Sequence, residues 1–106
     1  MDNNSYYIRY VILINRKKDY TTDVIKMHVE HLKRLKENGQ LILCGPFKDY
    51  GGGIVIIKTE SINEAKIVAE SDPFIIGGFS TYELRTLELA TRENKYLQNN
   101  NKNFKG

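Results

Sequence analysis

The chain has 106 residues, of which 41% are hydrophobic and 27% are charged, and its formal net charge is +3. This length predicts one domain with a modest core, and the composition is that of an ordinary globular protein. No apolar run approaches the roughly 18 residues that a membrane span needs, which excludes a membrane-spanning protein. The first ten residues, MDNNSYYIRY, lack a basic region followed by an apolar one, so we expect a cytoplasmic protein.

The positive charge is concentrated at the C-terminal end. Residues 92–106 contain four basic residues and one acidic residue, whereas the other 91 residues contain twelve of each. We therefore divide the chain into a neutral domain, residues 1–88, and a polar tail, residues 89–106, which is expected to be partly helical or disordered. A solvated end of this kind gives no reason to expect a nucleic-acid partner.

Six elements are predicted in the order strand, helix, strand, strand, helix, strand, over residues 6–15, 22–38, 40–45, 52–59, 61–72 and 79–89. One of residues 21–23 is expected to cap the first helix, and Gly39 supplies its left-handed stop. Ser61 and Glu64 have the spacing of a capping box at the start of the second helix. The glycines at 51–53 predict a turn with positive φ or a close approach to a ligand.

This βαββαβ order predicts an α+β fold of the ferredoxin-like type. Right-handed crossovers place both helices on one face of a four-stranded antiparallel sheet. The other face does not read as polar, because the strand segments LILC and IVII are apolar on both sides. We therefore expect a second copy to pack its sheet against this face, as a homodimer of the dimeric α/β barrel type.

RNA-recognition domains share the same order of elements, so they are an alternative for this fold. They stack bases on aromatic side chains of their central strands. The third predicted strand, GGIVIIKT, contains no aromatic residue. RNA binding is therefore not expected.

His28 and Asp72 are expected to meet at one end of the sheet. His28 falls inside the apolar arc of the first helix, with His31 at the margin of that arc. Asp72 precedes Pro73, where the second helix has to stop, and a carboxylate at a helix C-terminus lacks a favourable partner. The pair is either a proton-transfer site or a core histidine with a satisfied hydrogen bond, and the residues alone leave both open.

A longer pattern resembles the YciI-like (YCII-related) family. His28, Leu32, Leu35 and Gly39 are followed by LILCGPF, by SINEA and by DPF, in the right order over residues 6 to about 87. The resemblance implies a ferredoxin-like dimeric α/β barrel with a His and Asp pair in a cleft, which carries onto His28 and Asp72. Relatives include a dehydrochlorinase of chlorinated hydroxyhydroquinone, and fold neighbours include muconolactone isomerases. Many members have an arginine three residues before the histidine, where this chain has Ile25, which weakens the transfer of an anion-binding role.

The predicted function is proton transfer on a small organic substrate by a lyase, such as a dehydrochlorinase, or by an isomerase. His28 acts as general base and then acid, and Asp72 orients it. The expected substrate-binding positions are Gly45, Pro46, Phe47, Gly53 and Phe74. No cofactor is expected and no metal, because His28 and His31 lack a third ligand in sequence. The alternative is a non-catalytic, metabolite-binding dimer with a structural His–Asp pair.

The single cysteine, Cys44, lies in the predicted strand LILCG. No basic residue adjoins it, so we expect a small buried thiol rather than a reactive one. One cysteine cannot form an intramolecular disulfide, which agrees with a reducing compartment.

Overall fold

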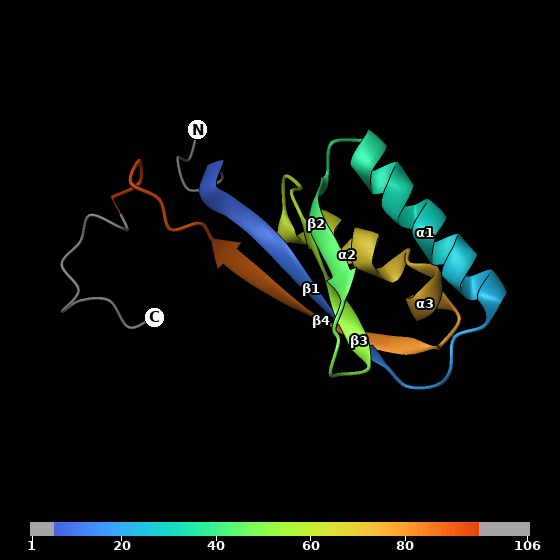
Figure 1. Cartoon of the computed structure of the whole chain (residues 1–106). Helices are drawn as coiled ribbons and strands as arrows, with labels where there is room; N and C mark the ends of the chain where they lie inside the picture. The colour runs from blue at the N-terminus through green and yellow to red at the C-terminus, as the bar shows by residue number, and fades with distance from the viewer. Residues whose placement is uncertain (1–5, 96–106) are drawn as a thin grey trace.

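The computed structural model describes residues 6–95, which form a four-stranded antiparallel sheet with its helices packed on one face (Figure 1). The strand order across the sheet is β2-β3-β1-β4. In chain order the elements are β1 Ile8–Arg16, α1 Thr22–Glu37, β2 Leu41–Pro46, β3 Gly52–Ile57, α2 Ile62–Glu70, α3 Pro73–Ile76 and β4 Ser80–Glu88. This is the ferredoxin-like α+β fold, and the prediction of it is confirmed.

Local hydrogen bonds fix the start of each long helix where the sequence predicted it. The Thr21 side chain accepts from the Val24 backbone N–H at 3.1 Å and caps α1. Ser61 caps α2 in the same way, accepting from the Glu64 N–H at 3.2 Å. The return bond of the capping box is shifted by one residue, since the Glu64 carboxylate accepts from the Glu60 N–H. Gly39, with φ of 77°, ends α1 as expected.

Asp72 begins a helix instead of ending one, which corrects the sequence prediction. α2 stops at Glu70, and Asp72 is the N-cap of the short helix α3, with Pro73 in its first turn. The Asp72 side chain accepts from the Phe74 backbone N–H at 2.9 Å. A proline at the first helical position costs no hydrogen bond, because that N–H has no partner in the helix. The acid before the proline therefore starts a new turn, and this turn directs Asp72 back toward α1.

The core lies between the sheet and the helices. Alternate residues of β1 (Tyr10, Ile12 and Ile14) are buried there, and β3 contributes Val55 and Ile57. α2 meets them with small side chains, Ala65 and Ala69, and α1 with Leu35. Each fully buried branched side chain stabilises the fold by roughly 1.5–3 kcal/mol relative to an exposed one.

The opposite face of the sheet carries an apolar row over β1, β3 and β2, beside the charged residues Glu83 and Arg85 of β4. Val11 pairs in the register with Ile56, and Leu13 with Ile54, which puts these four side chains on the face away from the helices. Leu43 extends the row onto β2, where it is 51% exposed. No element within residues 6–95 covers this face (Figure 1), and the prediction that the strands are apolar on both sides is confirmed.

Beyond β4, the structure describes only a short part of the predicted tail. The Leu89 N–H donates to the Tyr7 carbonyl at 2.8 Å, and residues 92–95 form a turn. The rest of the tail, residues 96–106, lies outside the described residues. Within the described part, the helices are too short or too polar to cross a membrane.

Candidate functional site

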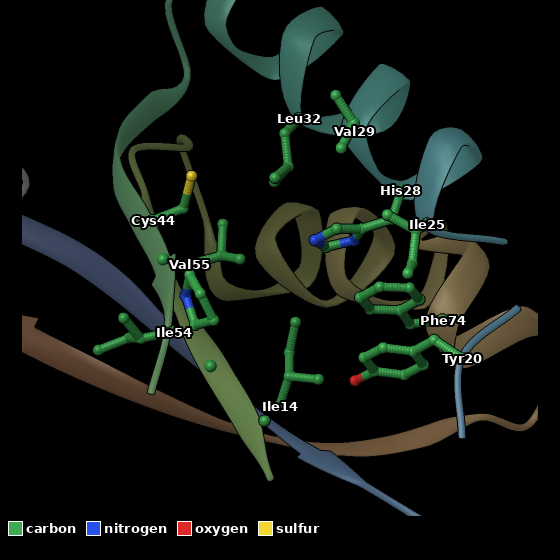
Figure 2. A pocket seen from close by; sticks show the side chains of 14 residues that line it. Ile14, Tyr20, Ile25, His28, Val29, Leu32, Cys44, Ile54, Val55 and Phe74 are labelled. Carbon is green, nitrogen blue, oxygen red and sulfur yellow. The ribbon is translucent and has the colours of Figure 1, made fainter. Parts of the chain in front are cut away.

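A cavity of about 520 Å³ lies between α1, α3 and the end of the β2–β3 hairpin (Figure 2). This volume falls in the range typical of small-molecule sites. The lining comprises residues of α1, of the sheet and of the two aromatic segments, namely Ile25, His28, Val29, Leu32, Ile14, Cys44, Gly45, Pro46, Gly52, Gly53, Ile54, Val55, Tyr20 and Phe74.

Glycines create the space under α1. Gly53 pairs with Ile14 on one side and Pro46 on the other, so a side chain there would point toward the helices. A Cβ at Gly53 would lie 2.5 Å from the Gly45 carbonyl oxygen. Gly52 has φ of 143°, and a Cβ there would collide with the Ile14 carbonyl oxygen. The predicted positive φ among the three glycines is therefore confirmed at Gly52. Because Gly52 and Gly53 have no side chains, main-chain atoms form the floor of the cavity.

α1 presents two neighbouring stripes, one to the core and one to the cavity. Val24, His31 and Leu35 are buried. Ile25, Val29 and Leu32, spaced i, i+4 and i+7, line the cavity instead.

The two histidines differ from their predicted places on this helix. His31, expected at the margin of the apolar arc, is only 6% exposed, whereas 14% of the His28 side chain is exposed. Burial lowers the pKa of His31 below its ordinary value of 6.5, although the charge of Asp72 opposes this. His31 is thus a core residue, and His28 is the histidine that faces the cavity.

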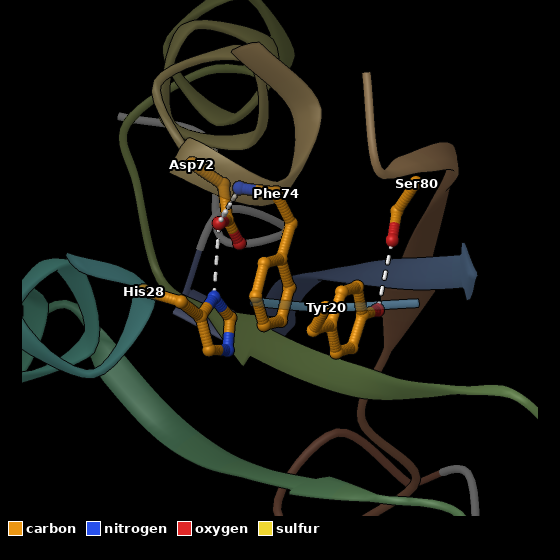
Figure 3. A network of polar contacts seen from close by, with 5 residues as sticks. All are labelled: Tyr20, His28, Asp72, Phe74 and Ser80. Carbon is orange, nitrogen blue, oxygen red and sulfur yellow. Dashed lines mark hydrogen bonds and ion pairs between the residues drawn. The ribbon is translucent and has the colours of Figure 1, made fainter. Parts of the chain in front are cut away.

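The structure brings His28 and Asp72 together. His28 Nδ1 lies 2.9 Å from Asp72 Oδ1, and the same oxygen accepts from the Phe74 N–H (Figure 3). Asp72 is 3% exposed, so its carboxylate is buried with both hydrogen-bond donors in place. Because Oδ1 accepts, Nδ1 carries the proton and the neutral ring keeps its lone pair on Nε2. The His28 ring projects into the cavity, toward the strand that carries Cys44 (Figure 2).

A stack of three rings holds the plane of the imidazole. The Phe74 ring lies parallel to both neighbours, with centroids 3.9 Å from His28 and 3.9 Å from Tyr20. The Tyr20 hydroxyl is hydrogen-bonded to Ser80 Oγ at 2.8 Å, which anchors the far end of the stack to β4 (Figure 3). Nδ1 and the ring plane are both fixed, so the His28 side chain is held in one orientation.

The structure places four of the five predicted substrate-binding residues at the cavity. Gly45, Pro46, Gly53 and Phe74 line it, whereas Phe47 lies in the hairpin, 38% exposed and with its ring centroid 6.3 Å from that of Tyr50. Their binding roles stay predictions.

The expectation of a buried Cys44 was wrong. Its thiol is exposed, and Cys44 lines the cavity. An irregularity in the strand pairing between Leu41 and Leu43 shifts the alternation of β2. Cys44 then pairs with Val55 and points to the helix face, where the hollow leaves it open (Figure 2).

Sequence reasoning missed Tyr20, Ser80 and the apolar wall of α1. The wall had a signal, because Ile25, Val29 and Leu32 repeat at helical spacing beside His28. Ile25 and Leu32 were instead interpreted as part of the apolar arc that faces the sheet, and Val29 was not considered. Tyr20 and Ser80 lie 60 positions apart in loop and strand segments, and no local pattern joins them.

The fold and the site together define a class of protein. It is a ferredoxin-like domain in which a buried carboxylate holds a histidine at a small cavity. The chain belongs to the YCII-related domain family, whose sequence model matches residues 8–88. The chain is 30% identical over 80 residues to the uncharacterized protein YjpA of Bacillus subtilis (strain 168). The alignment covers 76% of this chain and 94% of that protein.

The chain is also similar to solved structures. One is 5-chloro-2-hydroxyhydroquinone dehydrochlorinase from Burkholderia phenoliruptrix AC1100 in complex with 2,5-dihydroxybenzoquinone, with a TM-score of 0.61 and 20% identity. The match covers 80% of this chain and 97% of that one. Another is a dimeric ferredoxin-like protein of unknown function from Thermobifida fusca YX, with a TM-score of 0.47, 12% identity, and coverage of 77% of this chain and 90% of that one.

Proposed function

We propose that this protein is a small-molecule enzyme that transfers protons with His28, oriented by Asp72. The observation that carries the proposal is the 2.9 Å contact between His28 Nδ1 and Asp72 Oδ1, made by a ring that lines a cavity. A buried carboxylate fixes the tautomer of the imidazole and stabilises the imidazolium that forms when Nε2 takes a proton.

The proposed reaction is an elimination or an isomerisation. Nε2 takes a proton from substrate carbon or oxygen, and the electron pair left behind forms a double bond. In an elimination, a leaving group such as chloride departs with its bonding pair; in an isomerisation, the imidazolium returns the proton to another atom. The dehydrochlorinase of the same fold supports the first version by analogy. The proposal assigns no cofactor or metal, because the imidazole and the carboxylate supply both proton sites.

The surroundings of the cavity have proposed roles in binding. Gly45, Pro46 and Gly53 form its floor, and Phe74 places the imidazole while presenting a ring edge to the substrate. Phe47, which lies outside the lining, is proposed only as part of the hairpin that borders the opening.

We propose further that the working unit is a cytoplasmic homodimer joined through the sheet faces. The support is the uncovered apolar row on the face opposite the helices, which includes Val11, Leu13, Ile54 and Ile56. Monomers rarely leave such a row exposed to water. The cavity lies on the other side of the sheet, so dimer formation leaves it accessible.

A second candidate function is non-catalytic binding of a metabolite. One observation favours it: Asp72 Oδ1 also accepts from the Phe74 N–H and caps α3, so the carboxylate has a structural task of its own. In this case the His–Asp pair shapes the cavity without reacting.

Deuterium exchange measured by proton NMR separates the two functions without knowledge of the product. The purified protein is incubated in D₂O with chlorinated and monohydroxylated rings and with cyclic enones, and exchange and chloride release are followed. We expect catalysed exchange that falls by at least about 100-fold in His28→Gln. The matched control is His31→Gln, which changes the other histidine of the chain and should keep the rate.

Equal exchange in wild type and His28→Gln would overturn the mechanism. Binding of these compounds without exchange, in a protein that retains its fold by circular dichroism, would favour the metabolite-binding module.

A further inference from the structure

We infer that the cavity takes an uncharged, predominantly apolar ligand of one or two rings, with a single polar group directed at His28. The inference deepens the proposed function by naming its substrate class. It depends on the chemistry of the walls, which is independent of whether His28 reacts.

The walls of the cavity carry no fixed charge. Among the lining residues within the described part of the chain, none is Lys, Arg, Asp or Glu, and five (Ile14, Ile25, Val29, Leu32 and Val55) present aliphatic side chains on the helix side of the sheet. Phe74 and Tyr20 add aromatic surface. An apolar ligand therefore gains about 25 cal/mol for each Å² that it buries against these walls.

Few polar groups face the ligand. The Tyr20 hydroxyl is already hydrogen-bonded to Ser80 Oγ at 2.8 Å, which leaves the His28 ring as the main side-chain partner. A thiol such as that of Cys44 is only a weak donor. One polar group on the ligand is thus satisfied, and further ones would be buried at a cost.

An anionic ligand is opposed by two features. The buried carboxylate of Asp72 lies directly behind the imidazole, and no cation lies in the lining to compensate. Arg16 is near, with its guanidinium carbon 5.8 Å from the Tyr20 ring centroid, but it is not part of the lining. A carboxylate transferred into this space loses its water and meets no charged partner.

Ile25 is the specificity-determining position in this arrangement. It lies one turn before His28 on α1 and contributes an aliphatic side chain to the wall (Figure 2). Because it is 43% exposed, it borders the opening, so a longer side chain fits there without disturbing the core. An arginine at this position would offer a guanidinium to an anion on the ligand.

The test compares 2-naphthol with 6-hydroxy-2-naphthoate, which differ by one carboxylate. The chain has no tryptophan, so naphthol fluorescence reports binding without intrinsic interference. We expect 2-naphthol to bind the wild type at least about tenfold more tightly than the carboxylate. Ile25→Arg should improve carboxylate binding by about tenfold or more. The matched control, Ile67→Arg, places the same charge on an exposed position of α2 outside the lining and should leave both affinities unchanged.

Cys44 locates the bound probe. It is the single cysteine of the chain and lines the cavity, so bound 2-naphthol should slow its alkylation by N-ethylmaleimide. Carboxylate binding as tight as naphthol binding, no binding of either probe, or binding that leaves Cys44 alkylation unchanged would each overturn the inference. Naphthol binding that depends on residue 25, found without any exchange activity, would keep the ligand class and reject the enzyme. Exchange activity found only with anionic substrates would keep the enzyme and reject the ligand class.

Discussion

The rings of His28 and Phe74 lie face to face, with centroids 3.9 Å apart and planes within 11° of parallel. Phe74 is 6% exposed and is packed on its other face by Tyr20, also at 3.9 Å. The same residue donates its backbone N–H to Asp72 Oδ1. A single residue of α3 therefore positions both members of the His–Asp pair, one through its ring and the other through its main chain.

Replacing Phe74 with leucine removes the stack and keeps the backbone hydrogen bond. We expect the free energy of unfolding to fall by about 1–3 kcal/mol because a buried ring is lost. We also expect the exchange rate of folded protein to fall, since the imidazole plane is no longer fixed. Urea denaturation and the deuterium-exchange assay measure the two effects. Phe79→Leu is the control, because Phe79 contacts Tyr20 edge-on and does not stack on His28; an equal loss of rate in both variants contradicts the role of the stack.

Replacing Asp72 with asparagine separates the effect of the carboxylate charge from the effect of the hydrogen bonds that its oxygen accepts. Both hydrogen bonds end on one oxygen, Oδ1, and an amide oxygen in that place still accepts from His28 and Phe74. We expect Asp72→Asn to lose only about 0.5–1.5 kcal/mol of stability, whereas Asp72→Ala loses about 2–4 kcal/mol because two donors are left unpaired. If the charge stabilises the imidazolium, the exchange rate falls strongly in both variants. If the Asp72→Asn variant keeps its exchange rate, the negative charge is not needed, and Asp72 contributes only by capping α3 and fixing the tautomer of His28.

Stability should depend on pH through His31. Burial lowers its pKa in the folded state, and the charges of His28 and Arg34 act in the same direction. The unfolded chain then binds the proton more readily, so this contribution to stability is complete above pH 6.5, the ordinary pKa, and is lost as the pH falls toward the folded-state value. Thermal unfolding from about pH 8 to about pH 5 checks this, and His31→Gln should show a shallower decline over the same range. A steeper or unchanged decline in the variant would assign the effect to other groups.

A charge at the centre of the uncovered sheet face should separate the proposed dimer. Leu13 lies between Ile54 and Glu83 in the register, on the face opposite the helices. We expect Leu13→Lys to change the solution mass from twice 12.3 kDa to 12.3 kDa, measured by light scattering after size exclusion. Ile67→Lys, which adds the same charge on the helix side, should remain dimeric. A wild-type chain that is monomeric at micromolar concentration contradicts the proposed interface.

The sequence was most informative where short-range chemistry decides structure. Thr21, Ser61 and Gly39 mark helix ends through hydrogen bonds within a few residues, and these ends were predicted correctly. The meeting of His28 and Asp72 followed from topology, because a βαββαβ chain brings the start of one helix to the end of the other.

Prediction failed where a local signal had two meanings. Asp72 followed by Pro73 was interpreted as a helix stop, although the same pair is also a helix start, and the structure uses it as the latter. Cys44 was expected to be buried because it lies inside a predicted strand and has no basic neighbour, whereas its side chain points into the hollow beneath α1 and is exposed. The cavity wall escaped notice because Ile25, Val29 and Leu32 have the spacing of a core stripe, and only the missing side chains at Gly52 and Gly53 turn that stripe into the side of a hollow.

The absence of a side chain at Gly53, where an added Cβ would lie 2.5 Å from the Gly45 carbonyl oxygen, limits which positions of this domain can vary. Since no side chain fits at Gly53, substitutions cannot fill the hollow from below without separating β2 from β3. The outward positions of α1 have no such constraint: Ile25 and Val29 are 43% and 41% exposed. In this chain, substitutions of a few α1 residues can therefore reshape the cavity while its floor stays the same.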